Sequence, residues 1–417
     1  MWQKSKFKQA RFALLHFSIK ILMKSGSRAK HLLTRKTTDK FSVLWQILPI
    51  GLNPALYFRR YQYFFDLKKE TRELVARHKS KFATLKSKFV FFKKIILIVP
   101  LGSSDNWSSA SGNWFYEIYS SALDFFPDHK IEVFFIRDYG SSWPEVLFEK
   151  VCNNPQTSIL SFIENDSPHN MNGINFEHLI KLRHMWRGLF LGVIFDSVWP
   201  NTLNHAFILS HMDKGVIIVS IDRSIKTALP RNSSQCGPVF LPISKETIHQ
   251  FHEISKNNPK SIEFSFMGKT YPSRIHNIGA VLKTYQKLDH KYESDNKRLK
   301  YPSYIAKLAS SHFTLNLARA NAQSVFQLKC RVLEAALVGT IVVTDEKRFI
   351  RKYFPESNFI YYYRPEMIAA KINRLNLTKS KLQEEIQIMA ESIAPSDFWK
   401  KICASINSSK WIEFDQV

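Results

Sequence analysis

The segment from Gln327 to Asp345, QLKCRVLEAALVGTIVVTD, constrains the fold more than any other part of this 417-residue sequence. Residues 328–338 contain neither Pro nor Gly and are apolar almost all the way round, which predicts a buried helix. Gly339 follows as a glycine that ends the helix, and the β-branched run at 341–343 predicts a strand covered on both faces. A helix, a tight turn and a buried strand in this order form one step of a doubly wound α/β domain.

Three charged residues interrupt the apolar helix, namely Lys329, Arg331 and Glu334. A buried carboxylate needs a partner, and an Arg331–Glu334 ion pair at i, i+3 spacing is one interpretation. The other is that Glu334 accepts hydrogen bonds from the hydroxyls of a ligand, while the helix N-terminus and Lys329 hold an anion. This segment alone leaves both interpretations open.

At these residues the sequence resembles the C-terminal domain of the group 1 glycosyltransferases, in particular the branch named after spore-coat glycosyltransferases. That branch has a K/R-x-x-E-A-x-x-x-G-T segment before a strand, and the resemblance continues through residues 348–375. It implies a GT-B fold, in which two Rossmann-like doubly wound domains face each other. It also implies that Glu334 binds the ribose of a nucleotide-diphosphate sugar and that the preceding loop and helix start hold the diphosphate. In one departure, Phe326 stands where related retaining enzymes carry a second glutamate.

A second donor-binding candidate is the predicted strand at 262–267, which ends at Gly268 and is followed by Lys269 and Arg274. This resembles the first strand of the same family's C-terminal domain, with its F-x-G turn and following arginine. A glycine lets the backbone approach a ligand closely, and the two cations would meet the diphosphate. A turn glycine followed by solvated cations fits the same residues.

The rest of the chain predicts four parts. Strand and helix patterns alternate from Lys93 onward, with strands expected at 95–99, 131–136, 158–162, 189–195, 215–220 and 238–241. We expect a basic, aromatic helical extension at 1–92, a Rossmann-like acceptor domain at 93–242, a Rossmann-like nucleotide-sugar domain at 243–392 and a C-terminal helix crossing back at 393–417. Residues 241–259 are expected to cross between the domains.

Several first-domain strands are followed by polar or acidic residues, which in a parallel sheet converge on one edge. Two of these residues, His169 and Asp196, are candidates for the general base that activates an acceptor hydroxyl. Asp196 follows an apolar strand and precedes Pro200, which resembles, with a longer gap, the strand-Asp-x-Pro pattern of the same branch. A helix cap or a turn explains such acids equally well.

The net charge of +25 is concentrated at the N-terminus, because residues 1–94 hold 23 Lys/Arg and 4 Asp/Glu, or +19. Interleaved aromatic and aliphatic residues favour an interfacial helix on an anionic membrane surface. We therefore expect a cytoplasmic protein, peripheral on the inner face of the membrane. A basic helical subdomain, a disordered arm or a segment that binds nucleic acid has the same composition.

Motifs for metal binding are absent from the sequence. It contains no Asp-x-Asp, no HExxH and no CxxC, and its four cysteines are isolated, which indicates a reducing compartment. We expect no essential metal and no resident cofactor, with the nucleotide-diphosphate sugar acting as a co-substrate.

These patterns predict a metal-independent glycosyltransferase that moves a sugar from a nucleotide-diphosphate sugar to a cell-surface glycan or a lipid-linked acceptor. Two alternatives belong to other classes. Phe326 suggests a catalytically inactive GT-B-like binding or scaffold protein, and the basic N-terminal segment suggests a nucleic-acid-binding protein.

Overall fold

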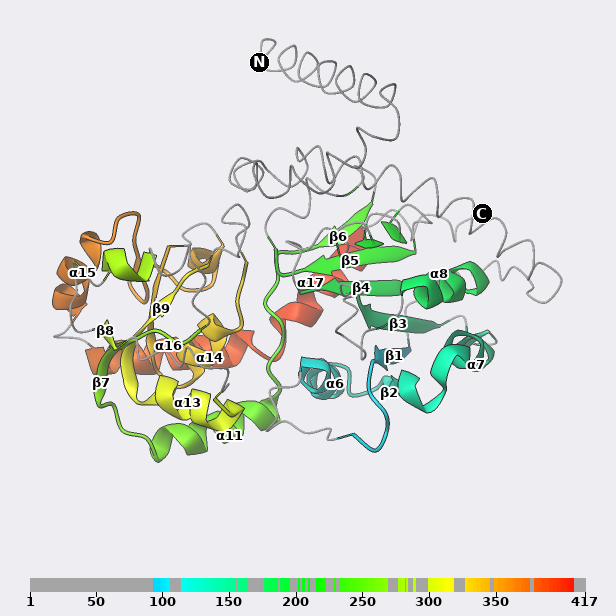
Figure 1. Ribbon diagram of the computed structural model, residues 1–417, viewed down its shortest axis with the longest axis horizontal. Coiled ribbons are helices and arrows are strands. Elements are labelled where there is room, and N and C mark those ends of the chain that lie inside the picture. The colour runs from blue at the N-terminus through cyan, green and yellow to red at the C-terminus, as the bar shows by residue number, and fades with distance from the viewer. Residues whose placement is uncertain are drawn as a thin grey trace, which may run out of the picture.

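The computed structural model of the protein is shown in Figure 1. It describes residues 93–105, 114–152, 154, 156–163, 174, 176–186, 188–195, 202, 205–206, 209–210, 215–222, 229, 233–268, 277–281, 283, 288–289, 299–318, 327–345, 349–375 and 379–408. The predicted extension at 1–92 lies outside these residues, as do His169, Asp196, Lys269, Arg274 and Phe326. Within the described ranges, no helix combines the length and apolarity needed to cross a membrane.

The first domain is built on a six-stranded parallel sheet with the strand order β2-β1-β3-β4-β5-β6. The strands are β1 (Lys94–Val99), β2 (Lys130–Phe135), β3 (Thr157–Phe162), β4 (Phe190–Ile194), β5 (Val216–Ser220) and β6 (Ser234–Cys236), and the helices are α6 (Trp114–Phe125), α7 (Trp143–Val151) and α8 (Phe176–Met185). The central strands β3, β4 and β5 are buried along their whole length, as expected for parallel strands covered on both faces.

The second domain has a five-stranded parallel sheet with the order β11-β10-β9-β7-β8. Its strands are β7 (Ile262–Ser265), β8 (Leu288–Asp289), β9 (Ser311–Asn316), β10 (Ile341–Thr344) and β11 (Ile360–Tyr361). Its helices are α11 (Lys245–Lys256), α13 (Tyr301–Ala309), α14 (Arg331–Leu337), α15 (Met367–Leu375) and α16 (Lys379–Ile393). One apolar cluster, which includes Phe264, Phe313, Leu333 and Val342, fills the space between sheet and helices.

Both sheets reverse their winding direction at one point. In the first, β2 lies on one side of β1 and β3 to β6 continue on the other; in the second, β8 lies on one side of β7 and β9 to β11 continue on the other. In doubly wound sheets, ligands bind outside the carboxyl ends of the strands at such a switch point. The structure confirms the predicted fold class of two Rossmann-like doubly wound domains.

The segment from Gln327 to Asp345 folds as helix, turn and strand, although the helix α14 is shorter than predicted. Gly339 has φ +64°, and the amides of Gly339 and Thr340 donate to the carbonyls of Ala336 and Ala335 as in a Schellman turn. The helix begins at Arg331 and not at 328, because the amide of Leu328 donates to the carbonyl of Ile221 in the first domain, at 3.0 Å. Pairing with the other domain therefore replaces the first helical turn.

One predicted strand is misplaced. The sixth strand lies at Ser234–Cys236 and not at 238–241, because Pro238 has no amide hydrogen with which to extend the ladder. The crossing at 241–259 contains the twelve-residue helix α11, which Ser244 caps by accepting a hydrogen bond from the amide of Thr247.

The C-terminal helix α17 (Asp397–Ser408) packs on the first domain, beside its sheet in Figure 1. The buried indole of Trp399 donates to the hydroxyl of Ser121 at 3.0 Å, and its ring centroid lies 5.4 Å from that of Phe126. The last described helix therefore packs on the domain that contains the first sheet.

A buried carboxylate joins the two domains at the start of α11. Glu117 of α6 accepts hydrogen bonds from the amide of Ser244 at 2.8 Å and from the hydroxyl of Thr247 at 2.7 Å. Burial raises the pKa of Glu117 to about 7, although these hydrogen bonds oppose the shift. Around it, the hydroxyl of Tyr116 donates to Glu246 at 2.6 Å, so α6 and α11 meet through several polar contacts.

Replacing Glu117 by Gln should change how stability depends on pH. The folded state holds the Glu117 proton up to about pH 7, whereas the unfolded chain releases it near pH 4.5. The free energy of unfolding of the wild type should therefore fall relative to Glu117→Gln as pH rises from about 4.5 to about 7, by about 3 kcal/mol, and stay level above.

Urea unfolding of both proteins between pH 4.5 and 8 measures this difference. Glu253→Gln, on the exposed face of α11, is the matched control, because the Lys256 hydrogen bond lowers the pKa of Glu253 and its titration falls below this window. Parallel pH curves for the wild type and Glu117→Gln would show that Glu117 does not titrate as described.

Candidate functional site

The carboxyl edge of the second sheet gathers the polar residues expected at a ligand site. The chain leaves β7 toward Gly268 and leaves β9 at Asn316, and these two strands flank the switch point. Helices α13 and α14 precede β9 and β10, so each helix begins at this same edge. The side chains considered below come from these strand ends and helix starts.

Gly268 and Arg331 lie against each other, as required if both belong to one site. The backbone of Gly268 has φ +154°, and a Cβ atom there would stand 2.9 Å from Nη2 of Arg331. The Arg331 guanidinium also lies over the ring of Phe266, with Cζ 5.8 Å from the centroid. Its Nε is buried without a hydrogen-bond partner among the described residues. The Arg331 guanidinium thus faces the backbone of Gly268, which has no side chain, at the end of β7.

Asn316 supplies a second polar atom at the same edge. Its fully buried side chain donates from Nδ2 to the hydroxyl of Thr344 at 3.1 Å, whereas its Oδ1 has no partner within the described part of the chain. Beside it, the amide of Ala318 donates to the carboxylate of Asp345 at 2.8 Å. Buried polar atoms without a partner are rare, so the Oδ1 of Asn316 marks this edge as a place where a ligand can donate a hydrogen bond. The sequence signal, an Asn at the end of an apolar strand, was missed.

Glu334 is buried, with 3% of its surface exposed, and its hydrogen bonds come from α13. The hydroxyl of Tyr301 donates to Oε1 at 2.9 Å and that of Tyr304 to Oε2 at 2.7 Å. Burial raises the pKa of Glu334, and the two hydroxyls and the charge of Arg331 lower it in part. The i, i+3 ion pair is therefore not what holds this carboxylate, because Arg331 acts on it through charge alone while the tyrosines bind it.

Lys329 points to the end of β9, where its ammonium donates to the carbonyl oxygen of Leu317. The structure thus places four of the predicted donor-binding residues, Gly268, Lys329, Arg331 and Glu334, around the carboxyl edge of one sheet. Lys269 and Arg274 follow Gly268 in sequence but lie outside the described residues. The same is true of His169 and Asp196, which follow the neighbouring strands β3 and β4 of the first domain.

Within the described ranges, no group of three or more His, Cys, Asp or Glu side chains is arranged to hold a metal ion. The expectation of metal-independent chemistry therefore stays a prediction for the assay given below.

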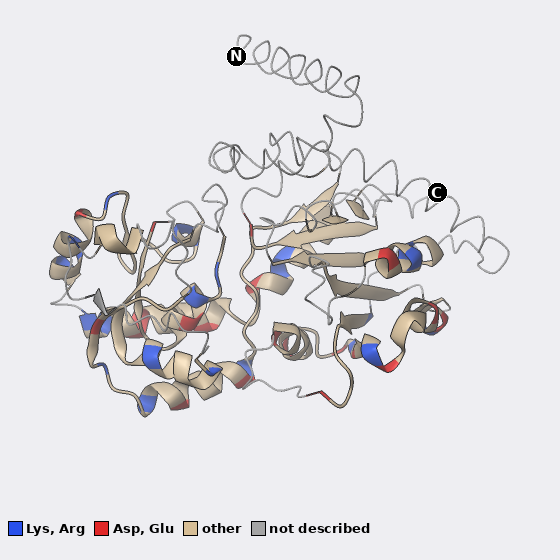
Figure 2. Cartoon of the chain, in the orientation of Figure 1, with Lys and Arg blue, Asp and Glu red and all other residues tan. Residues whose placement is uncertain are grey.

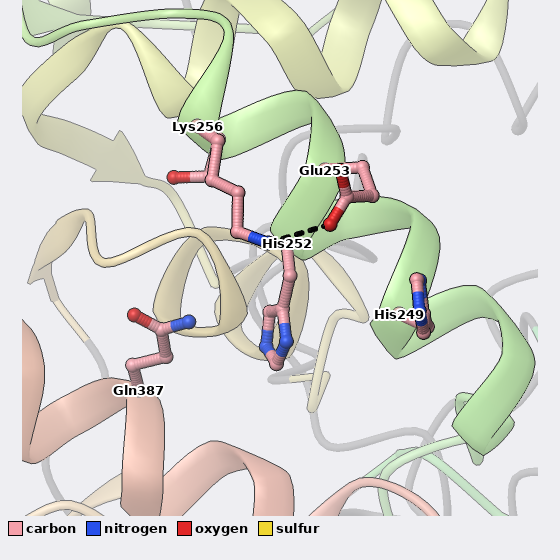
Figure 3. A pocket seen from close by; sticks show the side chains of 6 residues that line it. His249, His252, Glu253, Lys256 and Gln387 are labelled. Carbon is pink, nitrogen blue, oxygen red and sulfur yellow. Dashed lines mark hydrogen bonds and ion pairs between the residues drawn. The ribbon is translucent and has the colours of Figure 1, made fainter.

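A cavity of about 370 Å³ lies elsewhere, between α11 and α16, and is shown in Figure 3. Its lining residues are His249, His252, Glu253, Ser255, Lys256 and Gln387. The Lys256 ammonium donates to the Glu253 carboxylate at 2.6 Å, and Nε2 of His252 lies 2.9 Å from a Glu391 oxygen. Because its lysine and one of its histidines already face acids, the cavity offers less to a charged ligand than the carboxyl edge of the sheet does.

Comparison with known proteins supports the assignment of the second domain. Residues 249–394 match the profile of a family described as "Glycosyl transferase-like". A search of curated proteins finds no match.

Two solved structures with similar folds are both of TarM. One is a mutant of S. aureus TarM in complex with Fondaparinux, alpha-GlcNAc-glycerol and UDP, with 11% identity, a TM-score of 0.37 and coverage of 64% of this chain and 59% of that one. The other is a crystal structure of TarM, with 10% identity, a TM-score of 0.39 and coverage of 64% of this chain and 58% of that one. The chain therefore spans less than two thirds of the length of these relatives.

Two parallel Rossmann-like domains, of which the second carries a glycosyl transferase-like segment, are the architecture of the GT-B class. Within that class, the spore-coat branch rests on the sequence resemblance alone.

Gly268→Ala should destabilise the second domain, because the new Cβ would meet the Arg331 guanidinium at a φ of +154°. Strained backbone of this kind costs about 1–3 kcal/mol. Gly279→Ala is the matched control, since a Cβ there meets nothing within 4 Å and the residue is helical. That change should instead stabilise by about 0.5–1 kcal/mol. Urea unfolding of the three proteins measures both effects. Equal stability of Gly268→Ala and the wild type would contradict the close contact with Arg331.

Proposed function

We propose that the protein is a glycosyltransferase that binds a nucleotide-diphosphate sugar at the carboxyl edge of its second sheet. The sugar passes to a glycan or lipid-linked acceptor held by the first domain. The observation that carries this proposal is that Arg331, the bare backbone of Gly268 and a buried Asn316 oxygen, which has no partner among the described residues, lie at the switch point of a glycosyl transferase-like domain.

Arg331 and Gly268 form the diphosphate-binding part of the proposed site. A guanidinium presents several N–H donors in a plane that matches phosphate oxygens, and a residue without a side chain allows those oxygens to come close. When the sugar leaves, negative charge grows on the nucleoside diphosphate, and donors already in place stabilise it. Lys329 adds positive charge at this position. Lys269 and Arg274 follow Gly268 in the sequence and stay candidates for the same role.

Glu334 is assigned to the ribose. Each of its oxygens accepts one tyrosine hydrogen bond, which leaves further acceptor sites on both oxygens. Its small exposed part is what a ribose hydroxyl would contact. Burial also makes a hydrogen bond to this carboxylate stronger than the same bond in water.

In the first domain, His169 and Asp196 remain the candidates for a base that takes the proton of the acceptor hydroxyl. They follow the adjacent strands β3 and β4 in the sequence, and these strands end at the carboxyl edge of the first sheet. The structure does not describe their positions, and mutation has to distinguish them.

The membrane surface is part of the proposal and rests on sequence alone, through the charge of +19 in residues 1–94. In Figure 2, both basic and acidic residues are spread over the two described domains. The strong basic character thus belongs to the N-terminal segment and not to the two domains. We propose that this segment holds the enzyme on an anionic cytoplasmic face, near a lipid-linked acceptor.

Thermal unfolding against nucleotide sugars tests the function directly, since a ligand that binds the folded state raises its melting temperature. The panel contains the uridine, guanosine, adenosine and cytidine diphosphates and their common sugar conjugates. Hydrolysis of the sugar conjugate that binds, without added acceptor, then separates an enzyme from an inactive binding protein. No shift with any compound at millimolar concentration would contradict the proposal.

Donor hydrolysis and transfer should survive EDTA, because cationic side chains supply the charge that a metal supplies in other transferases. The assay compares the initial rate with EDTA against the rate after adding back Mg²⁺ or Mn²⁺. Equal rates, within about twofold, are expected. Loss of activity that either ion restores would contradict metal independence.

A further inference from the structure

Two tyrosines of α13 approach Glu334 from one face of their helix. Tyr301 and Tyr304 are three residues apart, with ring centroids 6.0 Å from each other. Their hydroxyls meet the two different oxygens of the Glu334 carboxylate, at 2.9 and 2.7 Å. Two rings from one helix thus fix both the position and the plane of a carboxylate on another helix.

Tyr304 also lies near the other charged group of the site. The charge of Arg331 acts on the Tyr304 hydroxyl and on the Glu334 carboxylate, and Arg331 and Glu334 both lie in the first turn of α14. The hydroxyl of Tyr304 donates to Oε2 of Glu334 at 2.7 Å. It therefore fixes the carboxylate assigned to the ribose beside the guanidinium assigned to the diphosphate.

Packing does not require this arrangement. Phenylalanines would fill the same space between α13 and α14, and burying a carboxylate costs more than burying an apolar side chain of equal size. The polar cluster has this cost beside the apolar cluster that fills the space between the sheet and the helices. Its position at the start of α13 and α14, beside the switch point, indicates a role in the site.

We propose that Tyr304, supported by Tyr301, is a positioning residue of the nucleotide site that holds the Glu334 carboxylate, beside Arg331, in the orientation in which it receives the ribose hydroxyls. This inference rests on the proposed function, because it concerns how that site is held. The residue does not touch the reacting atoms and acts through Glu334.

The proposal has a consequence for pH. Ligand hydroxyls donate to the ionised Glu334, so affinity should fall as pH drops through the pKa of Glu334. The Tyr304 and Tyr301 hydroxyls and the charge of Arg331 lower that pKa against the effect of burial. Loss of the Tyr304 hydroxyl should therefore raise it and move the loss of affinity to higher pH.

Two more titratable groups lie near this cluster, and neither alters the direction of the effect. Burial raises the pKa of the Cys330 thiol, so this group is neutral between pH 5 and 9. The carboxylate of Glu117 acts on Tyr301 and Cys330 across the domain boundary. Because Glu117 is present in every variant below, its own titration cancels in the comparison.

The test compares wild type, Tyr304→Phe, Glu334→Gln and the double variant by titration calorimetry between pH 5 and 9. The probe is whichever of the uridine, guanosine, adenosine or cytidine diphosphates raises the melting temperature most. Tyr353→Phe is the matched control, since that hydroxyl donates to Asp397 at 2.8 Å in another buried contact. Folding of each variant is checked by circular dichroism.

Tyr304→Phe is expected to weaken binding about tenfold at neutral pH, the scale for one hydrogen bond to a charged group. It should also move the acidic loss of affinity to higher pH. Tyr353→Phe should do neither. The terminal phosphate of the probe also titrates at about pH 6, equally for every variant. In the Glu334→Gln background only that common dependence should remain, and Tyr304→Phe should have little further effect. Where Tyr304→Phe does not fold, Tyr301→Phe should shift the profile in the same direction.

Two results would overturn the inference, and they are distinguishable. If the wild type binds nucleotide and Glu334→Gln weakens it, an unchanged affinity and pH profile in Tyr304→Phe removes the positioning role and leaves the proposed function intact. If the wild type binds none of the four nucleoside diphosphates, the proposed function and this inference fail together.

Discussion

The arrangement of the candidate site depends on one backbone contact between the domains. The amide of Leu328 donates to the carbonyl of Ile221, and Gln327 forms an antiparallel bridge with Asp222 just beyond β5. This pairing holds the segment before α14 extended against the first domain and sets where the helix begins. Arg331 and Glu334 occupy the first turn of that helix. Their position relative to the first domain is therefore set by the backbone pairing of Gln327 and Leu328.

Buried carboxylates recur where the second domain faces the first. Glu117 binds the start of α11 from the other domain, and Glu334 binds the first turn of α13 from within its own domain. Burial raises the pKa of both, and both accept two hydrogen bonds from neutral donors. Glu117 thus joins the second domain to the first, and Glu334 organises the candidate site. In both cases the hydrogen bonds offset part of the free-energy cost of burying a carboxylate.

The sequence revealed the repeating elements well because their signals are local. Gly339 ends α14 at φ +64°, a backbone conformation that glycine adopts without strain. The β-branched run after it forms β10. The partners of Glu334 could not be predicted in this way, since Tyr301 and Tyr304 lie some thirty residues earlier in the chain. Asn316 was missed because its significance depends on strand order, which places β9 beside β7. The helix α11 lies in the segment that the sequence predicts only as a crossing between domains, although Ser244 is a residue that commonly caps helices.

Hydrogen–deuterium exchange with and without a saturating nucleoside diphosphate tests the central claim most directly, because it locates the bound nucleotide without a mutation. The account predicts slower exchange in peptides covering residues 262–268 and 327–337, which include the end of β7 and the start of α14. Protection confined to the first domain, for example around residues 94–105, or none in the second domain at saturation, would contradict a nucleotide site at the carboxyl edge of the second sheet.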